Sequence, residues 1–105
     1  MGFNMQKLMK QAQKMQTDVA RVQEELKEKQ VEGQAGGGVV RALANGAQEI
    51  TAISIDPEVI DPEDKEMLED LVLAAVREAL NAARELAAQE MGKVTSGMGL
   101  PGGML

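Results

Sequence analysis

Four basic residues near the start of the chain form a candidate anion-binding set: Lys7, Lys10, Lys14 and Arg21. Their intervals of three, four and seven residues place them on one side of a helix. Cations held along one helix face can neutralise the phosphate groups of an anionic partner. We therefore take these four side chains as the candidate phosphate-binding site.

A charged helix face is often only solvated, and this alternative applies here. The distribution of charge along the face favours a site, because Glu24 and Glu28 occupy the same face farther along the chain. Positive charge is thereby confined to the first turns, whereas a solvated face would mix the signs. The interleaved glutamines are adequately explained as exposed helix residues.

The net charge of −6 does not exclude a phosphate-containing partner, because the acidic residues lie in another part of the chain. Residues 1–23 contain four Lys or Arg and one Asp, whereas residues 57–93 contain four Lys or Arg and ten Asp or Glu. We expect the first segment to attract anions and the later segment to repel them.

Catalytic, metal and cofactor chemistry has little support in this composition. The chain contains neither cysteine nor histidine, so common nucleophile–base pairs and zinc ligands are missing. The acidic stretch 56–64 lacks the ligand spacing of a calcium loop, and the glycines at 36–38 are not followed by the lysine of a phosphate-binding loop. We expect no enzyme activity, cofactor, metal or small-molecule substrate.

Two further features bear on compartment and partner. The absence of cysteine and of a signal-peptide pattern favours a cytoplasmic protein, and no apolar run is long enough to span a membrane. Phe3 is the only aromatic residue, whereas proteins that bind single strands stack several aromatic rings on bases. Duplex DNA is therefore the favoured nucleic-acid partner.

A long first helix, from about Asn4 to about Lys29, is indicated by apolar residues spaced alternately three and four apart. These residues form a coiled-coil seam that comprises Met5, Leu8, Ala12, Met15, Val19, Val22 and Leu26. The four basic residues fall on the side away from this seam. A helix of this length exceeds what a small domain covers, so we expect it to project or to meet a second subunit.

Three short antiparallel strands are expected after Gln30, where glycine-rich turns separate apolar and β-branched segments. Their predicted ranges are Val31–Ala35, Val39–Ala44 and Gln48–Ile55. The Asn45–Gly46 pair predicts a type I′ turn between the last two strands. Regular alternation along the third strand would place Ile50 on one face and both Ile53 and Ile55 on the other.

A second long helix is predicted from the Asp61–Pro62 start to about Met91, with Gly92 ending it. Its apolar face is broad and rich in alanine, which predicts close helix packing. This face comprises Leu68, Leu71, Val72, Ala75, Val76, Ala79, Leu80, Ala82, Ala83, Leu86 and Ala87.

Residues 93–105 are rich in glycine and are expected to form a mobile tail. The expected organisation is a single α+β domain over residues 1–92, with a small antiparallel three-stranded sheet and two long helices, followed by that tail.

Short segments spread along the whole chain resemble the YbaB/EbfC family and occur in the family's order. They are Met9-Lys10-Gln11-Ala12-Gln13 with Met15-Gln16, Gly36 to Val40, Asn45-Gly46, Ile55-Asp56-Pro57, Asp64 to Leu71, and Gly97 to Gly102. The resemblance implies an α-β-β-β-α subunit, a tweezer-like homodimer, association with the bacterial nucleoid, and binding to duplex DNA with an influence on gene expression. It implies no enzyme activity. It places DNA contact on the protruding first helix, the region of Lys7, Lys10 and Lys14, with Arg21 nearer the body.

A second hypothesis, from a different class, is a protein-interaction module accessory to recombination or DNA repair, without direct DNA contact. The first helix would then dock on a helical partner, and the acidic second helix would meet a basic protein surface. Replacing Lys7, Lys10 and Lys14 by glutamine discriminates the two hypotheses, because only DNA binding depends on those charges.

Overall fold

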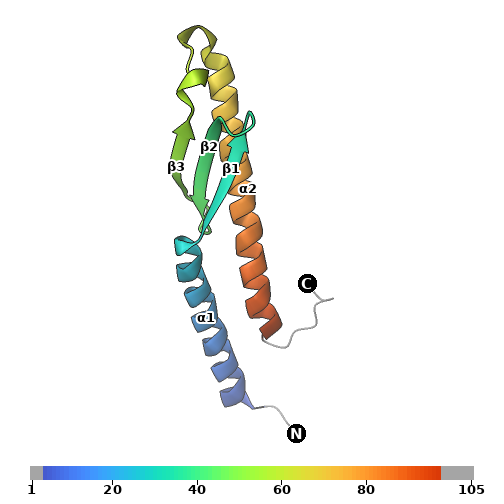
Figure 1. Ribbon diagram of the computed structural model, residues 1–105. Coiled ribbons are helices and arrows are strands. Elements are labelled where there is room, and N and C mark those ends of the chain that lie inside the picture. The colour runs from blue at the N-terminus through green and yellow to red at the C-terminus, as the bar shows by residue number, and fades with distance from the viewer. Residues whose placement is uncertain (1–3, 98–105) are drawn as a thin grey trace.

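The computed structural model describes residues 4–97, which form an elongated α-β-β-β-α subunit of 75 × 25 × 16 Å (Figure 1). Its elements are α1 (Met5–Glu28), β1 (Gln30–Ala35), β2 (Val40–Asn45), β3 (Ile50–Ile55) and α2 (Lys65–Gly97), with 3-10 helices at Pro57–Val59 and Pro62–Asp64. The predicted α+β fold and order of elements are confirmed. Figure 1 shows α1 and the sheet lying one after the other along the length of α2.

The antiparallel sheet, ordered β1-β2-β3, packs on α2 mainly through β1 and β2. Its core is made of small residues, and the fully buried side chains are Val40, Ala42, Ala44, Ala75, Ala79 and Ala83. The alanine-rich face predicted for the second helix supplies half of them. Gly33 permits this close packing, because a Cβ atom at its position would collide with backbone atoms of Ala75 and Ala79.

α1 packs on the C-terminal part of α2 through its own last turns. Val22 and Leu26 are buried in a cluster with Val94, and Val19 is partly buried beside them. The seam residues from Met5 to Met15 are exposed, and α1 extends beyond the described end of α2 (Figure 1). The helix therefore projects as expected, and this subunit covers only the last part of its seam.

A β-bulge overturns the predicted distribution of isoleucines in the third strand. The β2–β3 pairing is regular at first and then shifts by one residue, so that Ile50 pairs with Ala44 and Thr51 is left over. Directly paired residues project from the same face of a sheet. The extra residue therefore brings Ile50 onto the face shared by Ile53 and Ile55, which is the face that carries α2.

The loop between β2 and β3 is not the type I′ turn that Asn45–Gly46 predicts. The positive φ falls on Gln48 (64°), and the Asn45 Oδ1 atom accepts a hydrogen bond from the amide of Glu49 at 3.1 Å. Gly46 serves a different purpose: its N–H donates to the Leu26 carbonyl at 2.8 Å, and a Cβ would lie 2.7 Å from that oxygen. Contact with the end of α1, and not local turn chemistry, shapes this loop.

The second helix starts slightly later than predicted. Asp61 caps the preceding 3-10 helix, where its side chain accepts from the Glu63 amide at 3.0 Å. The cap of α2 is Asp64, whose Oδ1 accepts from the Met67 amide at 3.4 Å.

The predicted end of this helix at Gly92 is wrong, because α2 continues to Gly97. An internal glycine costs a helix only about 1 kcal/mol, and burial of Val94 against α1 offsets that loss. Residues 93–97 of the predicted tail are thus helical. The rest of that tail, residues 98–105, lies outside the described residues.

Two glycines give opposite expectations for alanine substitution. Gly33→Ala should lower the free energy of unfolding by at least about 2 kcal/mol, because the methyl group meets the backbone of α2. Gly92→Ala should raise it by about 0.5–1 kcal/mol, because a Cβ there meets nothing within 4 Å and alanine favours helix. Urea denaturation followed by circular dichroism measures both changes. A destabilising Gly92→Ala would contradict the continuous helix.

Candidate nucleic-acid interface

The N-terminal tip of α1 has a positive local field that arises partly from its backbone. Asn4 caps the helix, and its Oδ1 accepts from the Lys7 amide at 3.2 Å. The first turn contains no acidic residue, so nothing there opposes the positive end of the helix dipole. The tip is therefore suited to anions.

Lys7, Lys10 and Lys14 follow on one side of this tip, and all three are exposed. Helical neighbours three and four residues apart have Cβ atoms only about 5–6 Å from each other, so the structure groups these three lysines. In the described part of the chain, no carboxylate lies within 4.0 Å of their ammonium groups. We call these three residues the lysine arm.

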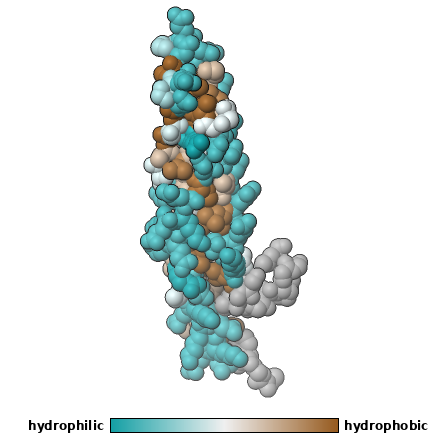
Figure 2. Space-filling model, viewed as in Figure 1, coloured by the Kyte–Doolittle hydropathy of each residue, from teal (hydrophilic) through white to brown (hydrophobic). Residues whose placement is uncertain are grey.

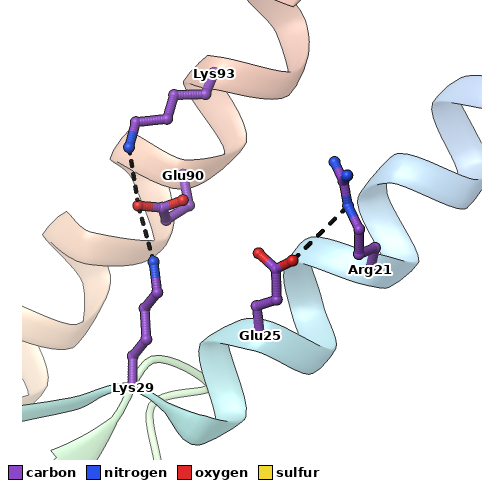
Figure 3. Close-up of polar contacts among 5 residues, drawn as sticks. All are labelled: Arg21, Glu25, Lys29, Glu90 and Lys93. Atoms are coloured by element: carbon purple, nitrogen blue, oxygen red, sulfur yellow. Dashed lines mark hydrogen bonds and ion pairs between the residues drawn. The ribbon is translucent and has the colours of Figure 1, made fainter.

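Arg21 lies about 10 Å farther along the helix than Lys14, at about 1.5 Å per residue, and both residues line one shallow pocket. Its guanidinium lies 3.7 Å from Asp18 and 3.9 Å from Glu25, the second contact being drawn in Figure 3. Such exposed pairs are weak, so the guanidinium can exchange partners, but the local charge is balanced by acid. The structure therefore places all four predicted site residues along α1, and Arg21 differs from the three lysines in having acidic partners.

The base of α1 is tied to α2 by an ion triad that the sequence did not indicate. The Glu90 carboxylate lies 3.3 Å from Lys29 Nζ and 3.2 Å from Lys93 Nζ (Figure 3). The hydrogen bonds from Lys93 and from Lys29 hold the pKa of Glu90 below its ordinary value of 4.5. Because Lys29 follows α1 directly and Glu90 belongs to α2, the Lys29–Glu90 ion pair links the end of α1 to α2.

A second candidate surface is apolar and lies where β3 passes beyond the cover of α2. Ile53 is 46% exposed and Leu73 of α2 is 47% exposed, and Ile50 is exposed as well. A groove beside them is lined by Ile55, Leu68, Glu69, Val72, Leu73 and Val76. Figure 2 shows apolar residues gathered over this end of the molecule, whereas α1 presents a hydrophilic side in the same view. Sequence reasoning missed this β3 surface because the bulge that aligns its isoleucines left no recognisable pattern.

A helix with exposed lysines that projects from a thin α-β-β-β-α body places this chain among small α+β proteins with a basic surface. The family model described as the YbaB/EbfC DNA-binding family matches residues 1–98, and the chain belongs to this family. It is 56% identical over 102 residues to a nucleoid-associated protein of Pelotomaculum thermopropionicum, covering 97% of each chain. It is 60% identical over 99 residues to one from Moorella thermoacetica, covering 94% of this chain and 95% of that one.

A solved structure supports the fold independently. An uncharacterized protein from Helicobacter pylori superposes with a TM-score of 0.73 at 23% identity, covering 83% of this chain and 91% of the other. The family is described by DNA binding and not by catalysis. Within residues 4–97, no helix is both long and apolar enough to cross a membrane.

The ion triad gives an expected pH dependence. Because the pKa of Glu90 is lowered in the folded state, its ionised form stabilises the fold at neutral pH, and that contribution disappears as the pH falls through the lowered pKa. Glu90→Gln should therefore be less stable than the wild type at pH 7, and the difference should shrink below pH 4.5. Urea denaturation at pH 7 and at a pH below 4.5 measures this difference in the free energy of unfolding. Glu85→Gln, an exposed neighbour on α2, is the control and should show no such change.

Proposed function

We propose that this protein is a nucleoid-associated protein that binds duplex DNA as a homodimer through the lysine arm. The observation that carries the proposal is the group of three exposed lysines at the positive end of a projecting helix, with no carboxylate of the described residues within 4.0 Å of their ammonium groups. Membership of a DNA-binding family supports the same partner. Binding of this kind would influence nucleoid organisation and gene expression.

The chemistry of the arm favours contact with phosphates over reading of bases. Lysine ammonium groups are compact point charges that bind phosphate well, and phosphate contacts carry little sequence information. The described part of α1 contains no aromatic or arginine side chain near its tip that would read base edges. Affinity for DNA should therefore depend strongly on salt and weakly on sequence.

The homodimer is supported by the shape of the subunit and by its β3 surface. The radius of gyration is 20.0 Å, whereas a compact domain of this length would have about 13 Å. Val40 is the largest fully buried side chain, so one subunit has only a thin core. A second copy that covers Ile53 and Leu73 on the β3 surface would add the missing apolar contact and would hold two arms apart, one on either side of a duplex.

DNA binding by the arm is tested with Lys7, Lys10 and Lys14 all replaced by glutamine. We expect this variant to lose retention of a generic duplex at near-physiological salt. Over a range of low salt concentrations, log affinity should decrease less steeply with log salt than in the wild type. The slope should differ by about 5, which is about 0.9 per phosphate over about six contacts per dimer. Fluorescence anisotropy with a labelled duplex measures both quantities.

The matched control changes the same charge elsewhere: Lys65, Arg77 and Arg84 on α2, all exposed, are replaced by glutamine. This variant should bind as the wild type does. Equal DNA binding by the arm variant and the wild type would overturn the site. Absence of binding by the wild-type protein even at low salt would favour the protein-interaction hypothesis instead.

The proposed dimer is tested on the two faces of β3. Ile53→Glu should halve the mass in solution, because a charge would be buried in the apolar contact between copies. Ser54→Glu is the control, since Ser54 pairs with Arg41 and points to the opposite face. It should remain dimeric. Sedimentation equilibrium gives the masses, and an Ile53→Glu variant that stays dimeric would place the interface elsewhere.

A further inference from the structure

The exposed part of the α1 seam is an apolar surface that the proposed function does not use. Met5 is 59% exposed and Leu8 is 51% exposed, and Ala12 and Met15 are exposed behind them. This stripe continues the seam whose last residues, Val22 and Leu26, are buried against α2. The same helix face thus packs on a helix over one part of its length and is left without a helix over the rest of the described chain.

The residues on both sides of this exposed stripe lack charge. In a coiled coil, the positions that flank the seam set partner choice through charged side chains. Here these positions are Met9, Gln11 and Gln16, while the three lysines of the arm lie on the opposite side. A shallow groove along the stripe, lined by Ala12, Met15, Gln16, Val19, Ala20 and Gln23, is also free of charge. An identical helix can therefore approach this face without like-charge repulsion across the seam.

We propose that the exposed seams of two copies of this chain pack against each other as an antiparallel helix pair. A parallel arrangement is disfavoured, because α2 covers each seam at Val22 and Leu26 and the two α2 helices would meet between the arms. In the antiparallel arrangement the tip of one arm ends where the other arm meets its own α2.

Side-chain size selects a register for this pair. When the two-fold axis crosses the helix pair at the level of residue 10, Leu8 of one helix opposes the small Ala12 of the other, and Met5 opposes Met15. The seam has two kinds of apolar heptad position, one held by Met5 and Ala12 and the other by Leu8 and Met15. Each of these pairs joins one position of each kind, as in antiparallel coiled coils, and the large Leu8 faces the small Ala12 at the centre. Methionine at both ends adapts its shape to the remaining space.

The contact is small, and this sets when it forms. A stripe over residues 5–16 is about 17 Å long, and a pair of such stripes buries less than the roughly 1,200 Å² typical of a stable interface. The contact therefore forms where the local concentration is high, as when several molecules lie side by side on one duplex. It links neighbouring molecules and makes their binding cooperative, while the lysines on the far side of α1 stay free.

The arm–arm contact is tested by disulfide formation, because the chain contains no cysteine of its own. Met5→Cys and Met15→Cys proteins are mixed at high concentration under mild oxidation. The proposed register brings residue 5 of one chain next to residue 15 of the other. The two residues 5 are about 15 Å apart along the helix axis, and so are the two residues 15, which is too far for a disulfide. We expect the mixed disulfide to form at least about tenfold faster than either self-disulfide, and faster than in mixtures with a Lys10→Cys control on the outer side.

Two further variants separate this contact from the proposed function. The mixed disulfide should persist when Ile53→Glu removes the β3 surface and when no DNA is present. It should slow by about tenfold when Leu8→Glu places a charge in the seam. A mixed disulfide no faster than the control would overturn the proposal. A mixed disulfide that forms only after deletion of residues 98–105 would also overturn the proposal, because residues 98–105 and not a second copy would then be the occupant of the seam.

Discussion

The close approach of β1 to the backbone of α2 at Gly33 is the contact on which the rest of this structure depends. Because no side chain stands between the strand and the helix at this point, the surrounding core consists of alanines and a single fully buried valine. The sheet is thereby held close to α2, and the long axis of the helix becomes the long axis of the molecule (Figure 1). α1 is then positioned by what remains of the same helix.

A core this thin cannot cover all the apolar surface that the chain carries, since small domains bury a limited share of their surface. Two apolar areas are left over: the β3 surface, where the sheet passes beyond α2, and the seam of α1, where that helix passes beyond α2. Both are exposed because one helix supports the sheet and α1 in succession: α2 is too narrow to cover the whole sheet, and α1 extends beyond the described end of α2 (Figure 1). Each area is where we propose that another copy of the chain packs.

The tip and the root of the projecting helix differ in their local charge. At the root, Lys29 and Lys93 share the carboxylate of Glu90, and Arg21 lies between two acidic neighbours, so the positive charges there are largely balanced. At the tip, the cap is an uncharged asparagine and the lysines have no acidic partner in the described chain. An overall acidic protein can therefore present a positive surface, because the sign that a partner meets is set by local distribution and not by the net charge.

Features that arise from local interactions could be predicted from the amino-acid sequence. Helical spacing predicted both helices, glycine-rich turns predicted three strands between them, and the order of elements followed. The grouping of Lys7, Lys10 and Lys14 was also predictable, since helix geometry alone places residues three and four apart side by side. Features that depend on contacts between distant segments became visible only in the folded chain. Gly46 serves the end of α1 and not a type I′ turn, the bulge at Thr51 moves Ile50 to the other face, and α2 runs through Gly92 because Val94 packs on α1. These outcomes were beyond local rules, because each is fixed by a partner residue at least twenty positions away or by the register of a neighbouring strand.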